Sequence, residues 1–288
     1  MMKVAVFGSR NRKIDQIKIV FDELKKHDVK IAVQDKFYRH IMSLGLDYKV
    51  GEIIMNDDFA ADMVISIGGD GTFLRTTAAI GKKDIPIFGI NAGRLGFLAD
   101  INENELAKAM EEVLTGKYTI EQRSLLQLST SEKVFEGYNY ALNEIAVLKQ
   151  DTASMITVNA HIDDQFLNSY EADGLIIATP TGSTAYAMSV GGPIMTPTAS
   201  NFILAAVAPH SLTARPLVVE DCSVVTLDIE SRSGSFLISV DGRSNVLPAD
   251  TRLTIKKADF TLKVIKRQGQ TFYSTLRDKL MWGVDSRS

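Results

Sequence analysis

The first 117 residues alternate short apolar runs with segments of helical periodicity. Apolar runs predict strands at 4–8, 29–33, 63–67 and 87–90. Over 14–26 and 104–114 apolar residues recur at the three- and four-residue spacing of a helix that buries one face. Strands that alternate with helices are typical of a parallel sheet covered by helices. In such sheets ligands bind at the carboxyl ends of the strands.

After residue 117 the pattern changes to apolar or alternating runs separated by turn residues, which is typical of an antiparallel sheet or sandwich. Predicted strands lie at 125–128, 142–148, 155–162, 175–178, 224–229, 236–240 and 253–255. The last stretch, 272–282, predicts a helix. We therefore expect a Rossmann-like α/β domain over 1–117 and an all-β, antiparallel, sandwich-like domain over 118–265. The segment 266–288 is expected to pack back on one of the two.

Composition narrows the class of protein only slightly. The 288 residues are 45% hydrophobic and 23% charged, with a net charge of −3, which is the balance of an ordinary globular protein. This charge argues against nucleic acid or a membrane as a partner. The single cysteine, Cys222, excludes an internal disulfide, and its apolar neighbours predict a buried or edge-strand thiol. Because no signal peptide or spanning segment is recognisable, we expect a cytoplasmic protein.

The most informative run begins where the predicted strand 63–67 ends, and it reads Gly68-Gly69-Asp70-Gly71-Thr72. Glycines let backbone N–H groups approach an anion, and a helix N-terminus that follows them favours negative charge. A carboxylate repels phosphates, so its presence among them indicates a chemical role, such as accepting a proton from a hydroxyl. The alternative is a tight turn in which Asp70 merely caps the helix.

Several other kinds of site are excluded by the sequence. It contains no G-x-x-x-x-G-K-[ST] phosphate loop, no G-x-G-x-x-G dinucleotide fingerprint and no G-x-S-x-G nucleophile elbow. The four histidines are scattered without the spacing of metal ligands.

Three further segments combine glycines with polar residues. The run 91–98 (NAGRLGFL) follows a predicted strand, and its simplest interpretation is a loop that packs Leu95 and Phe97 into the core. Asn143 and Glu144 interrupt an apolar run, where a polar pair is costly unless it is hydrogen-bonded or lies at a solvated edge. The run 173–186 (DGLIIATPTGSTAY) ends a strand in a turn of small residues that suits a ligand loop or a helix cap.

The glycine–aspartate run resembles the signature shared by NAD kinases, diacylglycerol and sphingosine kinases and, more distantly, phosphofructokinases. The runs 91–98 and 173–186, with the pair Asn143-Glu144, resemble NAD kinases specifically. The chain is therefore similar to the NAD kinase family from residue 68 to residue 193, and more weakly to Asp241-Gly242.

This resemblance implies transfer of a phosphoryl group from ATP, or in some members polyphosphate, to the 2′-hydroxyl of the adenosine ribose of NAD. Asp70 would accept the proton of that hydroxyl, and Gly68, Gly69, Gly71 and Thr72 would hold the donor phosphates. A divalent cation, Mg²⁺ by preference, would be carried on nucleotide oxygens, with no dedicated protein ligands. The residues expected to contact NAD are Asp70, Gly71, Arg75, Asn143, Glu144, Asp173, Thr184, Ala185, Tyr186, Ala187, Met188, Ser189, Ala208 and Arg243.

The sequence departs from the family pattern at one position. Several relatives have a basic residue two positions before Asp173, where this chain has Glu171, so Arg75 or Arg243 would have to supply the missing charge. The resemblance also implies a homodimer or homotetramer. Two alternatives share the glycine–aspartate run: a lipid kinase of the diacylglycerol or sphingosine type, and a sensor that binds NAD or NADP without turnover.

Overall fold

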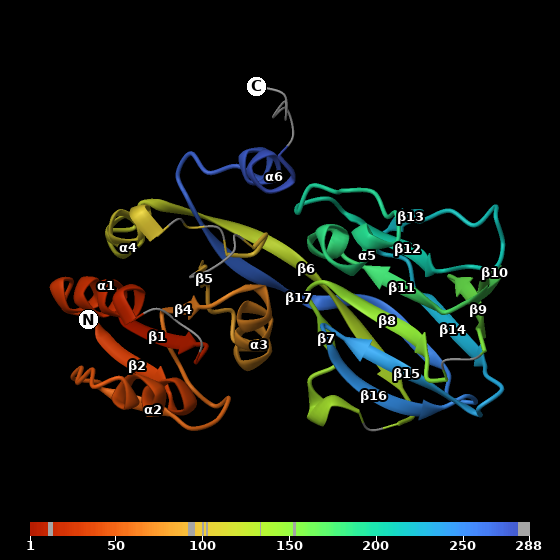
Figure 1. Ribbon diagram of the computed structural model, residues 1–288, viewed down its shortest axis with the longest axis horizontal. Coiled ribbons are helices and arrows are strands. Elements are labelled where there is room, and N and C mark those ends of the chain that lie inside the picture. Colours follow the sequence, from red (N-terminus) through yellow and green to blue (C-terminus); the bar gives the residue numbers. More distant parts are fainter. Residues whose placement is uncertain are drawn as a thin grey trace. The chain divides into compact units, whose positions relative to one another are not determined.

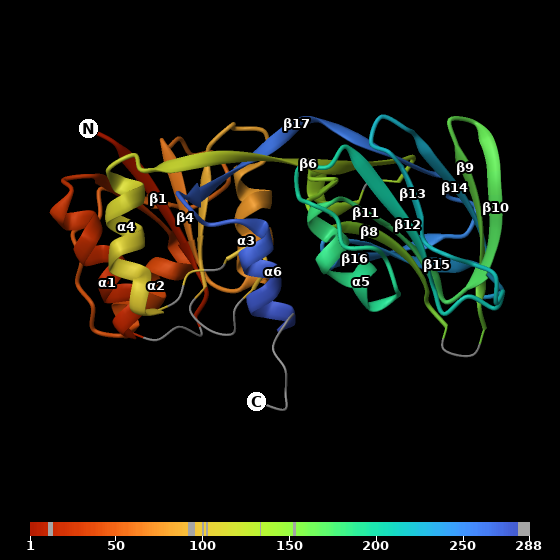
Figure 2. The same cartoon turned by 90° about the horizontal axis from the view of Figure 1, so that it is seen from above.

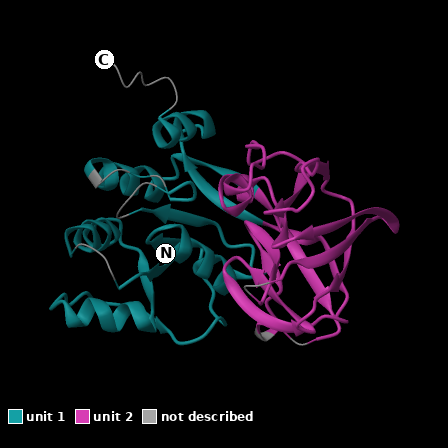
Figure 3. Cartoon of the chain, turned by 45° about the vertical axis from the view of Figure 1, so that its right-hand side comes forward, with its two compact units in different colours: residues 1–122, 262–288 teal, residues 123–261 magenta. Residues whose placement is uncertain are grey.

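The computed structural model describes residues 1–10, 14–91, 96–99, 101, 103–132, 134–151 and 154–281. They fall into two compact units, one formed by 1–122 with 262–288 and the other by 123–261 (Figure 3). Both divisions fall inside long strands, β6 (Tyr118–Thr130) and β17 (Leu253–Arg267), rather than at the expected 117/118 and 265/266. The C-terminal segment belongs to the first unit.

Unit 1 contains a parallel sheet in the order β5-β4-β1-β2-β3, as its alternating pattern predicts. The end of β17 adds to it beside β5, where Val264 pairs with Ile87 in parallel. The five strands are β1 (Lys3–Gly8), β2 (Lys30–Gln34), β3 (Glu52–Ile54), β4 (Met63–Ile67) and β5 (Ile87–Ile90).

Helices cover both faces of this sheet (Figures 1 and 2). Alternate strand residues, such as Val6 and Ile65, share a core with the apolar faces of α1, α2 and α4. The intervening residues face α3, where the Ser66 and Thr76 hydroxyls lie 3.2 Å apart. The helices are α1 (Ile14–Lys26), α2 (Asp35–Ser43), α3 (Asp70–Ile80) and α4 (Leu106–Leu114).

The direction in which the chain crosses the sheet reverses between β1 and β4. From β1 the chain proceeds outward to β2 and β3, whereas β4 leads to β5 on the other side of the sheet. At the carboxyl ends of these two strands the Ser9 N–H donates to the Ile67 carbonyl over 3.1 Å. Such a reversal point is where doubly wound sheets bind ligands.

Unit 2 is a pair of antiparallel sheets with a common core, which confirms the predicted all-β sandwich-like domain. One sheet has the order β13-β12-β11-β8-β15-β16, and the other joins β10, β9, β14 and β17 to β6 and β7. Their bounds are β7 (Tyr140–Ala141), β8 (Glu144–Lys149), β9 (Ile156–Ile162), β10 (Gln165–Ala172), β11 (Gly174–Ala178), β12 (Asn201–Val207), β13 (Leu217–Glu220), β14 (Val225–Glu230), β15 (Ser235–Val240) and β16 (Arg243–Pro248).

The outer face of the six-stranded sheet carries a patch of small residues covered by a short helix, α5 (Tyr186–Ser189). Ala146, Ala178 and Ala205 from three neighbouring strands pack there against Ala187 of α5. The small side chains let the loop before α5 lie close to the sheet.

One local expectation differs at its start and another is wrong. The predicted strand 142–148 is present as β8, but it begins two residues later, at Glu144, after a break that follows the end of β7 at Ala141. Cys222 is exposed in the turn between β13 and β14 rather than buried or on a strand. Its Sγ lies 3.4 Å from the Glu220 carboxylate, which raises the pKa of the thiol.

Candidate functional site

The glycine–aspartate run forms the junction between β4 and α3 in unit 1. Gly69 precedes the helix, and its carbonyl accepts hydrogen bonds from Thr72 and Phe73 at 2.8 and 3.1 Å. A Cβ on Gly68 would lie 2.3 Å from the Thr72 side chain, so this position requires glycine. Gly71 is exposed, and a Cβ there would meet only the Arg75 guanidinium, at 3.8 Å. The backbone is therefore packed closely on the Thr72 side and accessible on the Gly71 side.

Asp70 is the first residue of α3, but its side chain does not cap the helix. Its two carboxylate oxygens instead accept hydrogen bonds from the backbone N–H groups of Phe97 and Leu98, at 3.0 and 3.2 Å. A Cβ on Gly96 would lie 2.0 Å from the Asp70 carboxylate. The capping alternative is therefore wrong, and the loop 96–98 holds the Asp70 carboxylate. Residues 92–95 of the same run lie outside the described residues.

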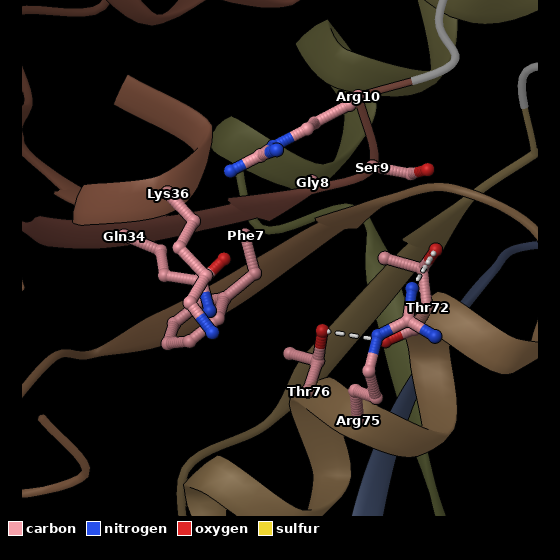
Figure 4. A pocket seen from close by; sticks show the side chains of 9 residues that line it. All are labelled: Phe7, Gly8, Ser9, Arg10, Gln34, Lys36, Thr72, Arg75 and Thr76. Carbon is pink, nitrogen blue, oxygen red and sulfur yellow. Dashed lines mark hydrogen bonds between the residues drawn. The ribbon is translucent and has the colours of Figure 1, made fainter. Parts of the chain in front are cut away.

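A cavity of about 420 Å³ lies beside this junction, at the carboxyl ends of β1 and β2 (Figure 4). Arg10 and Lys36 reach it from one side and Arg75 from α3 on the other. Among the described residues, its lining contains these three cations and no carboxylate; the other lining residues are Phe7, Gly8, Ser9, Gln34, Thr72 and Thr76. The Arg75 guanidinium also donates to the Thr72 hydroxyl over 3.2 Å. This chemistry suits a polyanion.

The C-terminal helix α6 (Phe272–Leu280) contacts the loop that holds Asp70. A reciprocal pair of hydrogen bonds between Thr271 and Ser274 begins this helix, and Leu276 is buried. The Lys279 ammonium lies 4.2 Å from the centroid of the Phe97 ring. The predicted helix is therefore confirmed, although Trp282 lies outside the described residues.

In unit 2, Asn143 and Glu144 lie at the break between β7 and β8. Asn143 is buried, and β8 is a central strand, so the solvated-edge interpretation is wrong. The Tyr186 backbone N–H donates to the Glu144 carboxylate, whereas Oε2 of Glu144 is buried and accepts no hydrogen bond from any described residue. Burial, with the nearby Asp241 charge, raises the pKa of Glu144 to about 7. An unpaired buried oxygen of this kind is an acceptor available to a ligand.

The turn after β11 closes over this break. The Thr179 N–H donates to the Asn143 carbonyl over 2.9 Å, and the Thr179 hydroxyl donates to the Leu142 carbonyl. A Cβ on Gly182 would lie 2.0 Å from the Asn143 carbonyl oxygen, so only glycine fits there. The turn continues through Thr184 and Ala185 into α5, where the Tyr186 side chain is 36% exposed.

Asp173 and Ala208 lie together at the other end of the β8–β11 strand pair. Asp173 directly precedes β11, and its N–H donates to the Val207 carbonyl over 2.9 Å. Its carboxylate pairs with the Lys149 ammonium at 2.7 Å. Ala208 has a φ of +44°, a conformation that is uncommon for a residue other than glycine. Gly174 and Ala178, which pair with Leu148 and Glu144, are four residue steps apart, so this group lies about 13 Å along the strand from Glu144.

The structure thus gathers the predicted residues into local groups. Those of unit 1 meet at the β4–α3 junction, and those of unit 2 meet at the two ends of the β8–β11 pair. Arg243 is directed elsewhere: its guanidinium donates to the Tyr138 and Tyr140 carbonyls at 2.8 and 2.9 Å. Glu171 is exposed, with its carboxylate 3.9 Å from His210.

Sequence reasoning missed the cations Arg10 and Lys36. The signal was present, since Arg10 follows the glycine that ends the first predicted strand and Lys36 follows the second. Two strand ends and the glycine–aspartate run meet at one edge of a parallel sheet, so these cations could have been placed there. Among the described residues, no cluster of three or more His, Cys, Asp or Glu suits a metal ion. Nor does any helix in that part of the chain have the length and apolarity to cross a membrane.

Family models match both parts of the chain. The model for the ATP-NAD kinase N-terminal domain matches residues 10–118, and that for the ATP-NAD kinase C-terminal domain matches residues 142–267. The NAD kinase of Bacteroides fragilis is 50% identical, over 99% of this chain and 100% of its own length. That of Porphyromonas gingivalis is 44% identical, over 100% of both chains.

Solved structures agree with these matches. A crystal structure of an NAD kinase from Archaeoglobus fulgidus in complex with ATP is 28% identical, with a TM-score of 0.76 over 97% of this chain and 99% of that one. The structure of yeast NADH kinase complexed with NADH shares the fold, with a TM-score of 0.87 and 22% identity over 99% of this chain and 89% of that one. These matches do not favour the lipid-kinase alternative. The chain belongs to the NAD kinase family of phosphotransferases.

Proposed function

We propose that this chain transfers the terminal phosphoryl group of ATP to the 2′-hydroxyl of the adenosine ribose of NAD, giving NADP, with Asp70 as the general base. The observation that carries this proposal is the orientation of the Asp70 carboxylate. Asp70 is the first residue of α3, and both oxygens of its carboxylate are held by the Phe97 and Leu98 N–H groups.

An ordinary carboxylate is sufficient for this chemistry. Phosphoryl transfer passes through a loose transition state, so orientation of the hydroxyl matters more than strong activation of it. A carboxylate has about four lone-pair positions, and the two N–H groups fix its plane while leaving positions for a substrate hydroxyl. Asp70 would accept the hydroxyl proton as the bond from oxygen to phosphorus forms and the bond to the departing diphosphate breaks.

The donor would bind in the cationic cavity of unit 1. Arg10, Lys36 and Arg75 would neutralise the triphosphate, and the N-terminus of α3 would favour its negative charge. Gly71 would bring its backbone N–H group to the phosphates, and Thr72 its hydroxyl. A divalent cation such as Mg²⁺ would be carried on the phosphate oxygens and would neutralise charge there.

The acceptor would bind on the outer face of the six-stranded sheet in unit 2. The free Oε2 of Glu144 would accept a hydrogen bond from a ribose hydroxyl, with Asn143 beside it as donor and acceptor. The loop from Thr184 to Ser189, including Ala185, Ala187 and Met188, would line the adenine and pyrophosphate. Asp173 and Ala208, at the far end of the same strand pair, would contact the other end of the dinucleotide.

A coupled assay for NADP with purified protein, ATP and NAD tests the proposal. We expect Asp70→Asn to abolish NADP formation while NAD still binds and the thermal midpoint stays near that of the wild type. The matched control is Asp62→Asn, because the Asp62 carboxylate also accepts a backbone N–H, from Lys3 at 2.6 Å, but is exposed. A fully active Asp70→Asn variant contradicts the proposed base. Binding of NAD by the wild type without any ATP-dependent product would identify a sensor instead.

A further inference from the structure

We propose that Asp241 is a positioning residue of the NAD site: its carboxylate fixes the backbone of residues 142–144 and thereby the direction in which Asn143 and Glu144 present their side chains. This inference rests on the role in NAD binding proposed above for Asn143 and Glu144. Asp241 would act without contacting either ATP or NAD.

The carboxylate accepts hydrogen bonds from three consecutive backbone amides. The donors are the N–H groups of Leu142, Asn143 and Glu144, at 2.7, 2.8 and 3.2 Å. The Asp241 N–H in turn donates to the Glu144 carbonyl over 3.1 Å. Leu142 and Asn143 lie in the break between β7 and β8, where their amides have no place in a strand ladder, and buried amides need an acceptor. The Asp241 carboxylate therefore makes the break possible.

Asp241 reaches the break because it lies in a tight hairpin turn between β15 and β16. Asp241 and Gly242 have φ values of +49° and +77°, which is typical of the two central residues of a type I′ turn. An Asp-Gly pair between alternating strands predicts a hairpin and nothing more. The unusual feature is that the aspartate side chain is used by a different segment, almost one hundred residues earlier in the chain.

Arg243, the next residue, holds the strand that enters the break. Besides donating to the Tyr138 and Tyr140 carbonyls, its guanidinium lies 5.1 Å from the Tyr138 ring centroid and 5.3 Å from that of Phe135. Both terminal nitrogens of the guanidinium therefore donate to backbone carbonyls. We therefore assign Arg243 to the same positioning task, in place of the direct NAD contact that the sequence resemblance implies.

The opposite side of the break is held by the turn after β11. Thr179 binds the Leu142 and Asn143 carbonyls, and Gly182 leaves room for the Asn143 carbonyl. The amides of the break thus bind Asp241 while its carbonyls bind the ligand loop. Removing the Asp241 carboxylate would loosen one side only, so the expected change is local to Asn143 and Glu144.

Asp241 also affects the charge of Glu144. The groups that face Glu144 are Asp241, from the hairpin turn, and the Tyr186 N–H, from α5. Arg243 and Tyr138 face Asp241. Burial raises the pKa of Asp241, and the hydrogen bonds from the three amides oppose that rise by favouring its ionised form. In the ionised form its negative charge disfavours a second charge on Glu144.

The test is Asp241→Asn, which keeps one carbonyl acceptor but removes the charge and the second acceptor. We expect the KM for NAD to rise about tenfold, the effect of losing one hydrogen bond to a charged group, with kcat and the KM for ATP within about twofold of the wild type. Loss of the Asp241 charge also lowers the pKa of Glu144, so the acid limb of NAD binding moves to lower pH. A merely structural role would lower stability without this split between the KM for NAD and the other two constants.

Asp163→Asn is the matched control. Asp163 also lies in a hairpin turn, with a φ of +49°, and its carboxylate accepts one backbone N–H, from Val224 at 2.9 Å. We expect it to leave every kinetic constant unchanged. An Asp241→Asn variant that matches the wild type, or that changes kcat and the KM for ATP as much as the KM for NAD, overturns the inference.

Two further variants separate this inference from the proposed function. If Asn143→Ala and Glu144→Gln both leave the KM for NAD unchanged, the proposed NAD contacts are wrong. If both raise it while Asp241→Asn does not, only the positioning role is wrong. If Asp241→Asn does not fold, Arg243→Lys is the substitute test, because it keeps the positive charge but loses the guanidinium that donates to the Tyr138 and Tyr140 carbonyls. We expect it to raise the KM for NAD several-fold, and an unchanged value would overturn the inference.

Discussion

The Phe97 backbone N–H donates a 3.0 Å hydrogen bond to the Asp70 carboxylate, which lies 27 residues earlier in the chain. With the parallel bond from Leu98, it joins the glycine–aspartate run to the second glycine-rich run of unit 1. Gly96 has no side chain because the carboxylate occupies the space that a Cβ would take. Together, the two runs therefore hold the Asp70 carboxylate in a fixed orientation.

Gly96→Ala should inactivate the enzyme while leaving its fold intact. The new Cβ would lie 2.0 Å from the Asp70 carboxylate and would displace it from the loop amides. We expect kcat to fall by about 100-fold, in the range for a displaced catalytic group, with little change in either KM. The double variant with Asp70→Asn should be no slower than Asp70→Asn alone. Wild-type kcat in Gly96→Ala would show that the position of the carboxylate does not matter.

The cationic cavity should govern the donor and not the acceptor. Replacing Arg10 and Lys36 together by alanine removes two of its three cations, and we expect the KM for ATP to rise about tenfold at low salt. Raising the salt concentration should reduce the difference from the wild type, because screening already weakens these charges. Lys18→Ala, an exposed lysine on α1, is the control. An equal rise in the KM for NAD would contradict the assignment of this cavity to the donor.

Four of the five strands of the β5-β4-β1-β2-β3 sheet were predictable because parallel strands that are buried on both faces form largely apolar runs, as 63–67 does. The three-residue strand β3 was not predicted. Gly116 also ends α4 as its sequence indicates, with a φ of +78°. Helix α2 and strand β12 were not predicted, because neither segment has a pattern that identifies its type. The run 35–43 is short and mostly polar, and the alanine-rich run 201–207 has no clear period that distinguishes strand from helix.

The candidate site was less predictable than the fold, because its organising contacts are long-range and involve the backbone. Nothing local to Phe97 indicates that its N–H binds Asp70, and nothing local to Asp241 indicates that it binds the amides of Leu142 to Glu144. The sequence shows that Asn143 and Glu144 interrupt an apolar run, but it does not show that the strand itself breaks there, because the break depends on an aspartate far along the chain. Hydrophobic patterns in a sequence indicate which residues are buried, but they do not indicate which distant segments contact one another.

Glu144 should make NAD binding depend on pH near neutrality. Its pKa of about 7 means that the ionised form, which accepts hydrogen bonds on both oxygens, is depleted below that pH. We therefore expect the KM for NAD to rise as the pH falls from 8 to 6, by up to about tenfold per pH unit below the pKa. Glu144→Gln should raise the KM for NAD at pH 8 and remove its pH dependence. A KM for NAD that has the same pH profile in both proteins would contradict this role.

Glu144 should also make stability depend on pH, but stability should fall as the pH rises, whereas NAD binding should strengthen. Burial raises the pKa of Glu144 above its usual 4.5, so between about pH 4.5 and 7 the unfolded chain releases a proton that the folded chain retains. The free energy of unfolding contributed by this group therefore falls as the pH rises through that window. In urea unfolding, the free energy of unfolding of Glu144→Gln should increase relative to that of the wild type by up to about 3 kcal/mol as the pH rises from 4.5 to 7. No further relative increase is expected above pH 7. A constant difference would show that the Glu144 carboxyl does not titrate abnormally.

The C-terminal helix should influence the chemical step through the loop that holds Asp70. The Lys279 ammonium lies over the Phe97 ring, a contact of about 0.5–1 kcal/mol at partly exposed positions. Lys279→Ala should therefore lower kcat by about two- to fivefold, with both KM values unchanged, because the loop amides orient the carboxylate and do not bind substrate. Arg277→Ala is the matched control: Arg277 also lies in the last turn of α6 and complements the helix dipole, but it is exposed. In the Asp70→Asn background Lys279→Ala should have no further effect, since no base remains to be oriented. Equal losses of kcat in Lys279→Ala and Arg277→Ala would mean that α6 acts through stability alone.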